Sequence, residues 1–428
     1  MTIRSVILGA CAGLLTVGVA AAADLPMTKG EAVEYVKVCS AFGPGFFYIP
    51  GSDTCLQISG QIRADYWYQS VPDPAANKRN INQTQFRTNA RIRFDARTQT
   101  DYGLLRSFFE LQAESNAGTA PPFGTGVHDT FTVRQAYLQF GGLTAGFAWS
   151  PYAFYDPKYQ AEFFAPYFGE QGRRDLISYT AQFDKAFATL SIEDNRDHRA
   201  GTTFGNSGTL NGVAINTEGG SQVPDIVGVI GYDDNKTGWG RVQVMGALHQ
   251  NRSALAAYGS DWGYSVGAAG NINFPVLSGA YIAAEGSYSE GAVKYLGVGG
   301  SQPSGSSLLS FGGADVYAST VAPFDLDRAK GWAIQAEAGL KFTDQLQAVL
   351  FGGYLDYDAP NIATSATADF HYYVIGGQVN YTVVKGFIAG AEVWYQNKDP
   401  NGGGTTVTAN PRDTADSVGA GVRLRRTF

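Results

Sequence analysis

A regular alternation of apolar and polar residues over Cys55–Gln69 limits most strongly what this chain can fold into. From Leu56 to Tyr68 every second residue is apolar or small, and most of the residues between them are polar. A period of two is typical of a β-strand with one apolar face and one hydrated face. The run is longer than most strands of soluble sheets, and it exceeds the roughly 9–11 residues with which a tilted strand crosses a bilayer.

The same alternation recurs along the whole chain. We predict about sixteen strands, the even number that bacterial outer-membrane barrels have. The predicted strands are Cys55–Gln69, Phe86–Arg97, Leu105–Ala113, Thr130–Phe140, Leu143–Trp149, Leu176–Phe183, Phe187–Glu193, Val223–Tyr232, Trp239–Gln250, Trp262–Phe274, Ala280–Ser289, Trp332–Phe342, Leu346–Asp356, Phe370–Thr382, Phe387–Asn397 and Ser417–Phe428.

The lengths of the connections separate this pattern from that of a soluble β-sandwich. Short turns such as Gly141–Gly142 alternate along the chain with long connections rich in Gly, Ser, Asn, Thr and Pro, such as Glu290–Gly331. Outer-membrane barrels have short periplasmic turns and long external loops. The sequence therefore predicts an all-β protein, a transmembrane antiparallel up-and-down β-barrel with both chain ends on the short-turn side.

The composition and the N-terminus agree with export to a membrane. Only 16% of the 428 residues are charged, against about 25% in ordinary soluble proteins. Arg4, the apolar run Val6–Ala20 and the small residues Ala21–Ala23 predict a signal peptide that is removed with residues 1–23. The alternatives are a retained membrane helix and lipoprotein processing at Cys11. We expect a periplasmic segment at residues 24–54, a barrel at 55–428, and a location in the Gram-negative outer membrane with its lipid as partner.

Charge and cysteine content narrow the function further. Removal of residues 1–23 takes away Arg4 and no acid, so the net charge changes from −7 to −8. An acidic exported protein is a poor partner for nucleic acid. Cys39 and Cys55 remain, and an even pair in an oxidising compartment predicts a disulfide, the alternative being two free thiols.

Three stretches carry a resemblance to a known family. They are YVKVCSAFGPGFFYIPGSDTCLQISGQIRADYWY at Tyr35–Tyr68, VRQAYLQFGGLTAGFAWSPYAFYD at Val133–Asp156, and the terminal VGAGVRLRRTF at Val418–Phe428. With these motifs the chain resembles the general porins of alphaproteobacteria, of the rhizobial type. The resemblance implies a homotrimer of sixteen-stranded barrels, each with a long third loop folded into the lumen.

The third long connection, Ser150–Asp175, is the candidate constriction of such a channel. It holds three prolines, eight Tyr or Phe residues and several acids, among them Asp156, Glu162 and Glu170. We expect basic side chains on the lumen face opposite it, because arginines facing lipid cost about 2–4 kcal/mol each. These are Arg63, Arg87, Arg91, Arg93, Arg97, Arg423 and Arg425. The alternatives are an ordinary external loop or trimer contact, and arginines that merely pair with Asp95, Glu110 or Glu114.

The predicted function is passive diffusion of small hydrophilic solutes and ions through a water-filled pore. A sugar channel with the third-loop aromatics as stacking surface is one alternative, and a barrel hydrolase is another. The four histidines, His128, His198, His249 and His371, lie in or beside long connections, where we expect them to be solvated rather than held in a catalytic dyad. No spacing of cysteines and histidines predicts a metal site, and no motif predicts a cofactor.

Overall fold

The computed structural model describes most of the chain, with gaps mainly at the N-terminus and in the long connections. It covers residues 37–70, 83–115, 129–155, 168–170, 172–200, 202–204, 209–210, 213–214, 219–234, 238–277, 279–298, 313–319, 324–360, 369–400 and 415–428. Among these residues, no helix has both the length and the apolar character that crossing a membrane requires.

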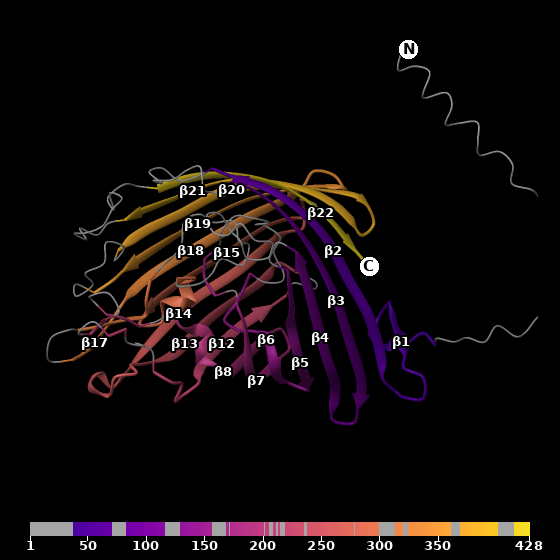
Figure 1. Ribbon diagram of the computed structural model, residues 1–428. Coiled ribbons are helices and arrows are strands. Elements are labelled where there is room, and N and C mark those ends of the chain that lie inside the picture. Colours follow the sequence, from indigo (N-terminus) through magenta and orange to yellow (C-terminus); the bar gives the residue numbers. More distant parts are fainter. Residues whose placement is uncertain are drawn as a thin grey trace, which may run out of the picture.

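Sixteen antiparallel strands close into one barrel (Figure 1). In chain order they are β2 (Cys55–Gln69), β3 (Thr84–Thr100), β4 (Gly103–Ser115), β5 (Thr130–Phe140), β6 (Leu143–Trp149), β7 (Arg173–Phe183), β8 (Ala186–Glu193), β12 (Asp225–Asp233), β13 (Gly240–Arg252), β14 (Ser260–Phe274), β15 (Ala280–Glu290), β18 (Lys330–Lys341), β19 (Leu346–Asp358), β20 (Phe370–Val384), β21 (Phe387–Pro400) and β22 (Ala415–Thr427). The last strand, β22, pairs with the first, β2, from Gln61 opposite Thr427 to Gln69 opposite Gly419. The predicted barrel is therefore confirmed, and closure leaves no open edge in the sheet.

The observed strands are mostly a few residues longer than the predicted ones. The bounds of β2, β5 and β6 are as predicted, but β3 begins at Thr84 instead of Phe86 and β7 at Arg173 instead of Leu176. The added residues are largely polar. Backbone hydrogen bonds of the ladder continue past the apolar band, because the ladder does not depend on alternation of the side chains.

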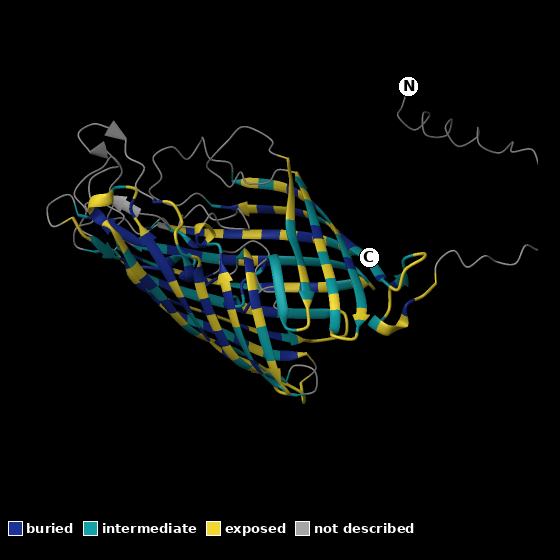
Figure 2. Cartoon of the chain, turned by 90° about the horizontal axis from the view of Figure 1, so that it is seen from below, coloured by how far each residue is buried: buried dark blue, intermediate teal, exposed yellow. Residues whose placement is uncertain are grey.

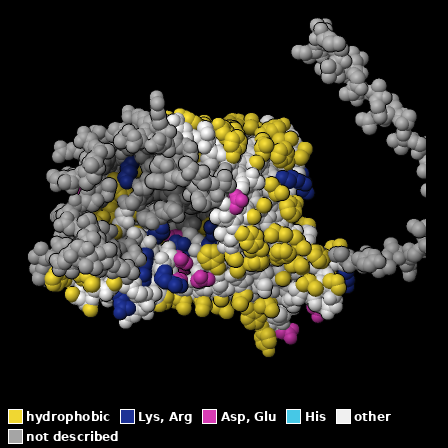
Figure 3. Space-filling view, viewed as in Figure 1, with side chains coloured by type: hydrophobic (Ala, Val, Ile, Leu, Met, Phe, Trp, Pro, Cys, Tyr) yellow, Lys and Arg dark blue, Asp and Glu magenta, His cyan; other side chains and the backbone are white. Residues whose placement is uncertain are grey.

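The two faces of the barrel differ in character, and buried and exposed positions alternate along its strands (Figure 2). Apolar side chains such as Ile62, Ile230 and Leu350 lie on the outer face with 54%, 70% and 70% of their surface exposed. Inward positions carry buried polar side chains such as Ser265 and Gln396. In the space-filling view, yellow apolar side chains dominate the outer surface, while charged side chains lie in the hollow between the walls (Figure 3). This is the arrangement expected of a barrel with lipid outside and water inside.

One β-bulge changes the alternation between β4 and β5. The pairing shifts between Glu110 and Leu111, so that Glu110 lies opposite Gln135 whereas Leu111 lies opposite Val133. Arg134 is the extra residue of β5. The outward apolar positions change accordingly from Phe131 and Val133 to Leu138 and Phe140. The bulge allows Arg134 and Gln135 both to contact the lumen side.

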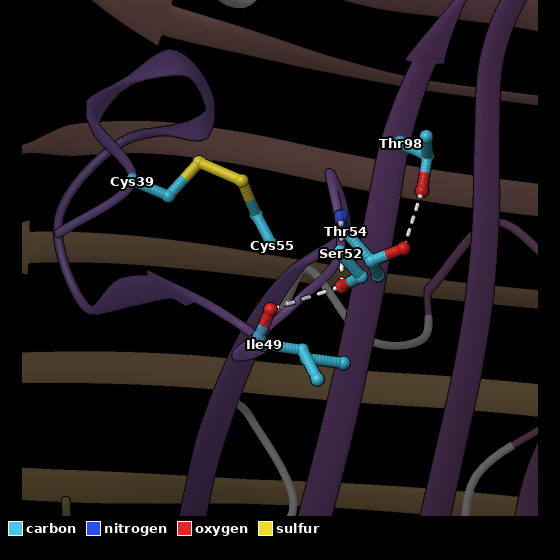
Figure 4. The surroundings of a disulfide bond; sticks show 6 residues. All are labelled: Cys39, Ile49, Ser52, Thr54, Cys55 and Thr98. Carbon is cyan, nitrogen blue, oxygen red and sulfur yellow. Dashed lines mark hydrogen bonds between the residues drawn. A yellow bond between two sulfur atoms is a disulfide. The ribbon is translucent and has the colours of Figure 1, made fainter. Parts of the chain in front are cut away.

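The segment before β2 folds against the base of the barrel (Figure 4). Cys39 and Cys55 form a disulfide, and the short strand β1 (Phe46–Tyr48) pairs with the start of β2. The Thr54 hydroxyl is hydrogen-bonded to that of Thr98 on β3 at 3.0 Å. The segment therefore lies at the barrel end where the chain terminates, the end marked C in Figure 1.

Smaller elements belong to the long connections. They are η2 (Ser40–Phe42) before β1, η4 (Asn195–His198) and the strands β9 (Thr202–Phe204), β10 (Thr209–Leu210) and β11 (Val213–Ala214) after β8, η5 (Ala256–Tyr258) after β13, and η6 (Val293–Leu296), β16 (Val316–Ala318) and β17 (Leu326–Arg328) after β15. β16 pairs in parallel with β9 and antiparallel with β17. The fourth and sixth long connections are thus joined by a small sheet of their own.

Candidate functional site

One part of the inner wall, formed by β22, β2, β3, β4 and β5, carries most of the charge predicted for the pore. We call it the arginine wall. Its basic residues outnumber its acidic ones by nine to four. They are Arg63, Arg87, Arg91, Arg93, Arg97, Arg106, Arg134, Arg423 and Arg425, against Asp65, Asp95, Glu110 and Glu114. The predicted residues Arg63, Arg87, Arg91, Arg93 and Arg423 all belong to it, so the fold brings them together.

Asp65 is the centre of the densest part of this wall. Its carboxylate lies 2.9 Å from Nε of Arg63, 3.2 Å from Nη2 of Arg87 and 2.7 Å from Nε of Arg423. Arg87 also contacts Glu114 at 3.1 Å. The Asp65 side chain has no exposed surface. One carboxylate thus receives three guanidinium groups, from the first, second and last strands of the barrel.

The remaining arginines of the wall differ in their partners and in their exposure. Arg93 donates a hydrogen bond from Nε to Glu110 at 2.9 Å, yet 32% of its side chain is exposed. Arg91 donates to the neutral amide oxygen of Gln112 at 2.8 Å. Arg97 pairs with Asp95, as the alternative interpretation of the sequence anticipated for this residue. Arg93 therefore keeps exposed surface despite its ion pair, and Arg91 keeps a charge that its neutral partner does not cancel.

The inner wall formed by β14, β15 and β18 to β20 binds both described ends of the third connection. The Tyr152 hydroxyl is hydrogen-bonded to Ser265 at 2.8 Å and to Ser287 at 3.2 Å. Phe168 donates its backbone N–H to Oε1 of Gln335, and its ring packs so closely on Gly353 that a Cβ there would lie 2.2 Å from Cδ2 of Phe168. The described aromatic side chains of this connection are buried against the wall.

Glu170 occupies a different position from the one expected. It is 2% exposed, and its carboxylate lies 2.8 Å from Nη2 of Arg174 and 3.5 Å from Nε2 of His198. The sequence predicted an acid facing the channel, but a carboxylate with these partners presents no free charge to it. Asp156 and Glu162, the other predicted acids of the constriction, lie outside the described residues.

The expectation that the histidines are solvated is wrong for two of them. His198 and His249 have no exposed surface. Nδ1 of His198 lies 3.2 Å from Asp225, and Nδ1 of His249 lies 2.8 Å from the other oxygen of the same carboxylate. Adjacent Asp197 and His198 gave no indication of this, because the shared partner Asp225 lies on another strand, β12. His128 lies outside the described residues.

Burial and charge act in opposite directions on the ionisation of this cluster. Burial raises the pKa of Glu170, but Arg174 and His198 outweigh it and hold the pKa at about 2. Burial and Arg174 lower the pKa of His198, but Glu170 and Asp225 outweigh them and raise it to about 9. Both groups are therefore charged near neutral pH.

The sequence did not single out three residues on which this interior depends. Asp65 and Tyr295 become important only through partners from other strands and connections. Arg134 reaches the lumen through the bulge of β5, and the shift of the apolar positions from Val133 to Leu138 was the signal that could have revealed it. Among the described residues there is no group of three or more His, Cys, Asp or Glu side chains suited to a metal ion.

Comparisons with known proteins agree with this architecture. Residues 24–421 match a family model described as "Porin subfamily". The chain is 28% identical over 383 residues to porin Omp2b of Brucella abortus (strain 2308), covering 82% of this chain and 94% of that one. It is 29% identical over 349 residues to porin Omp2b of Brucella neotomae, covering 77% and 84%.

Solved structures show the same fold at low identity. The outer-membrane channel DcaP of Acinetobacter baumannii matches with a TM-score of 0.64 and 15% identity, over 89% of this chain and 99% of that one. The anion-selective porin of Comamonas acidovorans matches with a TM-score of 0.50 and 13% identity, over 88% and 100%. The trimer form of OmpT of Vibrio cholerae matches with a TM-score of 0.50 and 13% identity, over 88% and 100%.

Proposed function

Because this chain belongs to the porin subfamily, we propose that its outer-membrane channel conducts small hydrophilic solutes and ions along the arginine wall. The protein is a porin and not an enzyme. The observation that carries the proposal is the unequal lining of the barrel. One wall has nine arginines and four acids, whereas the described aromatics of the third connection cover the wall formed by β14, β15 and β18 to β20.

The excess of arginine favours a weak preference for anions. Fixed charges act mostly within a screening length of about 8 Å at physiological salt. Side chains at the passage therefore outweigh the acidic net charge of the whole chain, part of which lies in distant connections. Arg93, with 32% of its side chain exposed, and Arg91, which donates to a neutral amide, supply positive charge of the wall to this passage.

Neutralising these two arginines tests the proposal. The double variant Arg91→Gln, Arg93→Gln is recorded in a planar bilayer under a potassium chloride gradient, and its reversal potential should shift toward cation preference. Arg426→Gln is the matched control, because Arg426 is an exposed residue near the end of β22 and donates to the carbonyl of Lys385. Equal reversal potentials in wild type and the double variant would reject the assigned path.

A second experiment concerns the narrowing by the third connection. Tyr155 donates its hydroxyl to the carbonyl of Gln335, and Phe168 donates its N–H to the side chain of the same residue. The two residues that flank 156–167 therefore both contact Gln335 of the inner wall. Deletion of residues 156–167 should raise the single-channel conductance. An unchanged conductance would show that this segment, with Asp156 and Glu162, does not narrow the passage.

The sugar-channel alternative has no specific support in the described residues. Tyr152, Phe154, Tyr155 and Phe168 are all less than 9% exposed and hold the connection to the wall. They therefore offer little ring surface for stacking a pyranose. A general diffusion channel remains the function that the described lining favours.

A further inference from the structure

The sixth long connection also sends a segment into the barrel. Directly after β15, Ala292 leads into η6, in which Val293, Tyr295 and Leu296 have no exposed surface. η6 packs on β15 and β18. Leu296 approaches Gly331 of β18 so closely that a Cβ there would lie 3.2 Å from Cδ1 of Leu296. A connection that extends into solvent would leave its apolar residues exposed. The apolar residues of η6 are instead buried next to inward-facing residues of the strands.

Tyr295 joins η6 to two other connections. Its ring lies 4.4 Å from the ring of His198 with an angle of 15° between the planes, and 4.9 Å from the ring of Tyr152. Its hydroxyl donates to Oδ2 of Asp225 at 2.9 Å. Tyr152 belongs to the third connection, whereas His198 belongs to the fourth. One buried side chain therefore contacts the third and fourth connections and the first residue of β12.

The backbone of η6 holds the other described end of the third connection. The N–H of Gly169 donates to the carbonyl of Leu296 at 3.0 Å. Gly297 follows with φ of +93°, and a Cβ at this position would lie 3.6 Å from N and O of Gly169. Only Gly adopts this backbone conformation readily. η6 thus touches the third connection both before and after residues 156–167.

We propose that η6 is a second element of the constriction and that Tyr295 is the positioning residue that fixes the third connection against the wall. The inference rests on the proposed function in two respects, since it requires that the barrel conducts ions and that the third connection narrows the passage. It differs in assigning the width of the passage to two connections instead of one. Lys294 is the least buried residue of η6, so its side chain is the one of this element that water and ions in the passage can reach most readily.

The first test removes the Tyr295 ring. Tyr295→Ala should raise the single-channel conductance and the open-channel noise, because the third connection loses one anchor. Tyr295→Phe keeps the ring stacks and loses only the bond to Asp225, so its conductance should stay closer to that of wild type. Tyr317→Ala is the matched control, because Tyr317 lies in the same connection, is 4% exposed and bonds to Tyr357 instead. Tyr317 belongs to one buried cluster with Phe168 and Leu296 but is not stacked on Tyr152 or His198, so Tyr317→Ala should raise the conductance less than Tyr295→Ala does.

A second test does not depend on removing a buried ring. Lys294→Cys is treated with a charged methanethiosulfonate reagent during recording, and modification should cause a stepwise loss of current. Lys330→Cys, at the exposed start of β18, is the control and should keep its current, as should wild type treated in the same way. Should Tyr295→Ala fail to form a barrel, this experiment decides alone.

The outcomes separate the two proposals. A conducting wild type together with unchanged current in modified Lys294→Cys would overturn the role of η6 and leave the porin function intact. Absence of ion conduction in wild type would reject the proposed function itself. An equal rise of conductance in Tyr295→Ala and Tyr317→Ala would also overturn the inference, because it would show a general loosening of the sixth connection.

Discussion

At the scale of single residues, Asp65 links the first and the last strand of the barrel. Its carboxylate forms ion pairs with Arg63 of its own strand, Arg87 of β3 and Arg423 of β22. Three guanidinium groups around one buried carboxylate leave a local excess of positive charge. Removing the carboxylate would leave these guanidinium groups close together without their shared partner, which is costlier than losing a single exposed ion pair.

Asp65→Asn should therefore lower the stability of the barrel. Loss of one partner from a buried ion pair costs about 3 kcal/mol or more, and water in the lumen reduces this. The measurement is the temperature at which the folded band converts to the unfolded band on a gel. Asp95→Asn is the control, because Asp95 pairs with Arg97 and Arg106 away from the seam between β2 and β22. Equal transition temperatures for wild type and Asp65→Asn would contradict the argument.

The cluster around His198 should respond to pH with a definite sign. His198 faces Glu170, Glu193 and Asp225, with Arg174 and the Tyr295 ring nearby. Its raised pKa means that its stabilisation is fully present below the ordinary value of 6.5 and is lost as the pH rises through about 9. The lowered pKa of Glu170 means that its stabilisation is present above 4.5 and is lost as the pH falls toward 2.

Hydrogen exchange at the η4 amides provides the measurement. Protection in wild type should be greatest between pH 4.5 and 6.5, after correction for the intrinsic exchange rate, and should fall by pH 10. His198→Gln lacks the ionisable ring and should show no such loss between pH 6.5 and 10. The same alkaline loss in His198→Gln would assign the effect to another group.

At the scale of elements, the disulfide fixes a short segment to a strand that is already held by the barrel. Cys55 is the first residue of β2, and Cys39 packs with Phe46 of β1. Arg97 of β3 lies over the Phe46 ring at 4.9 Å. These contacts attach residues 37–54 to the base of β2 and β3, whereas β2 itself is held by its ladders to β3 and β22.

The double variant Cys39→Ser, Cys55→Ser should thus keep the thermal transition of the barrel but expose residues 37–54 to proteases. Closing a loop of this size stabilises by about 3 kcal/mol in the chain-entropy description, and this energy acts on the segment. Denatured, unreduced wild type should give no thiol-labelling signal from Cys39 or Cys55. Labelling of both cysteines would refute the bond.

At the scale of the whole molecule, the apolar outer surface shows that the barrel requires a lipid environment. Large apolar side chains with substantial exposure occur around the barrel, from Ile58 of β2 to Leu424 of β22. In water such a surface would be unstable, but lipid covers it in a membrane. The same flat apolar surface can also meet a second copy of the chain.

We propose a homotrimer, which the resemblance to the general porins of alphaproteobacteria implies and for which the exposed apolar outer face offers a contact surface. Native mass spectrometry of detergent-extracted protein should give a mass near three times that of one processed chain. Dilution over a range of detergent concentrations controls for artificial association. A monomer under all conditions would contradict the expectation.

The sequence by itself determined the barrel, because alternation is a local property of each strand. Successive side chains of a strand point to opposite faces, so the position of a residue along its strand decides whether its side chain faces lipid or water. For this reason the bounds of β2, β5 and β6, the number of strands and the lumen positions of Arg63, Arg87 and Arg423 could be predicted. The alternation of short turns with long connections, which is also visible in the sequence, indicated an outer-membrane barrel instead of a soluble sandwich.

Only the tertiary structure decided which charges meet and which are buried. Asp65 and Arg423 are separated by 358 positions in the chain, and they are neighbours only because the barrel closes. Glu170 and His198 are buried because three connections meet at Tyr295, and no local pattern marks that meeting. The physical reason is that the position of a residue along its strand fixes the face on which its side chain lies. Its partners depend instead on closure of the sheet and on contacts between the connections.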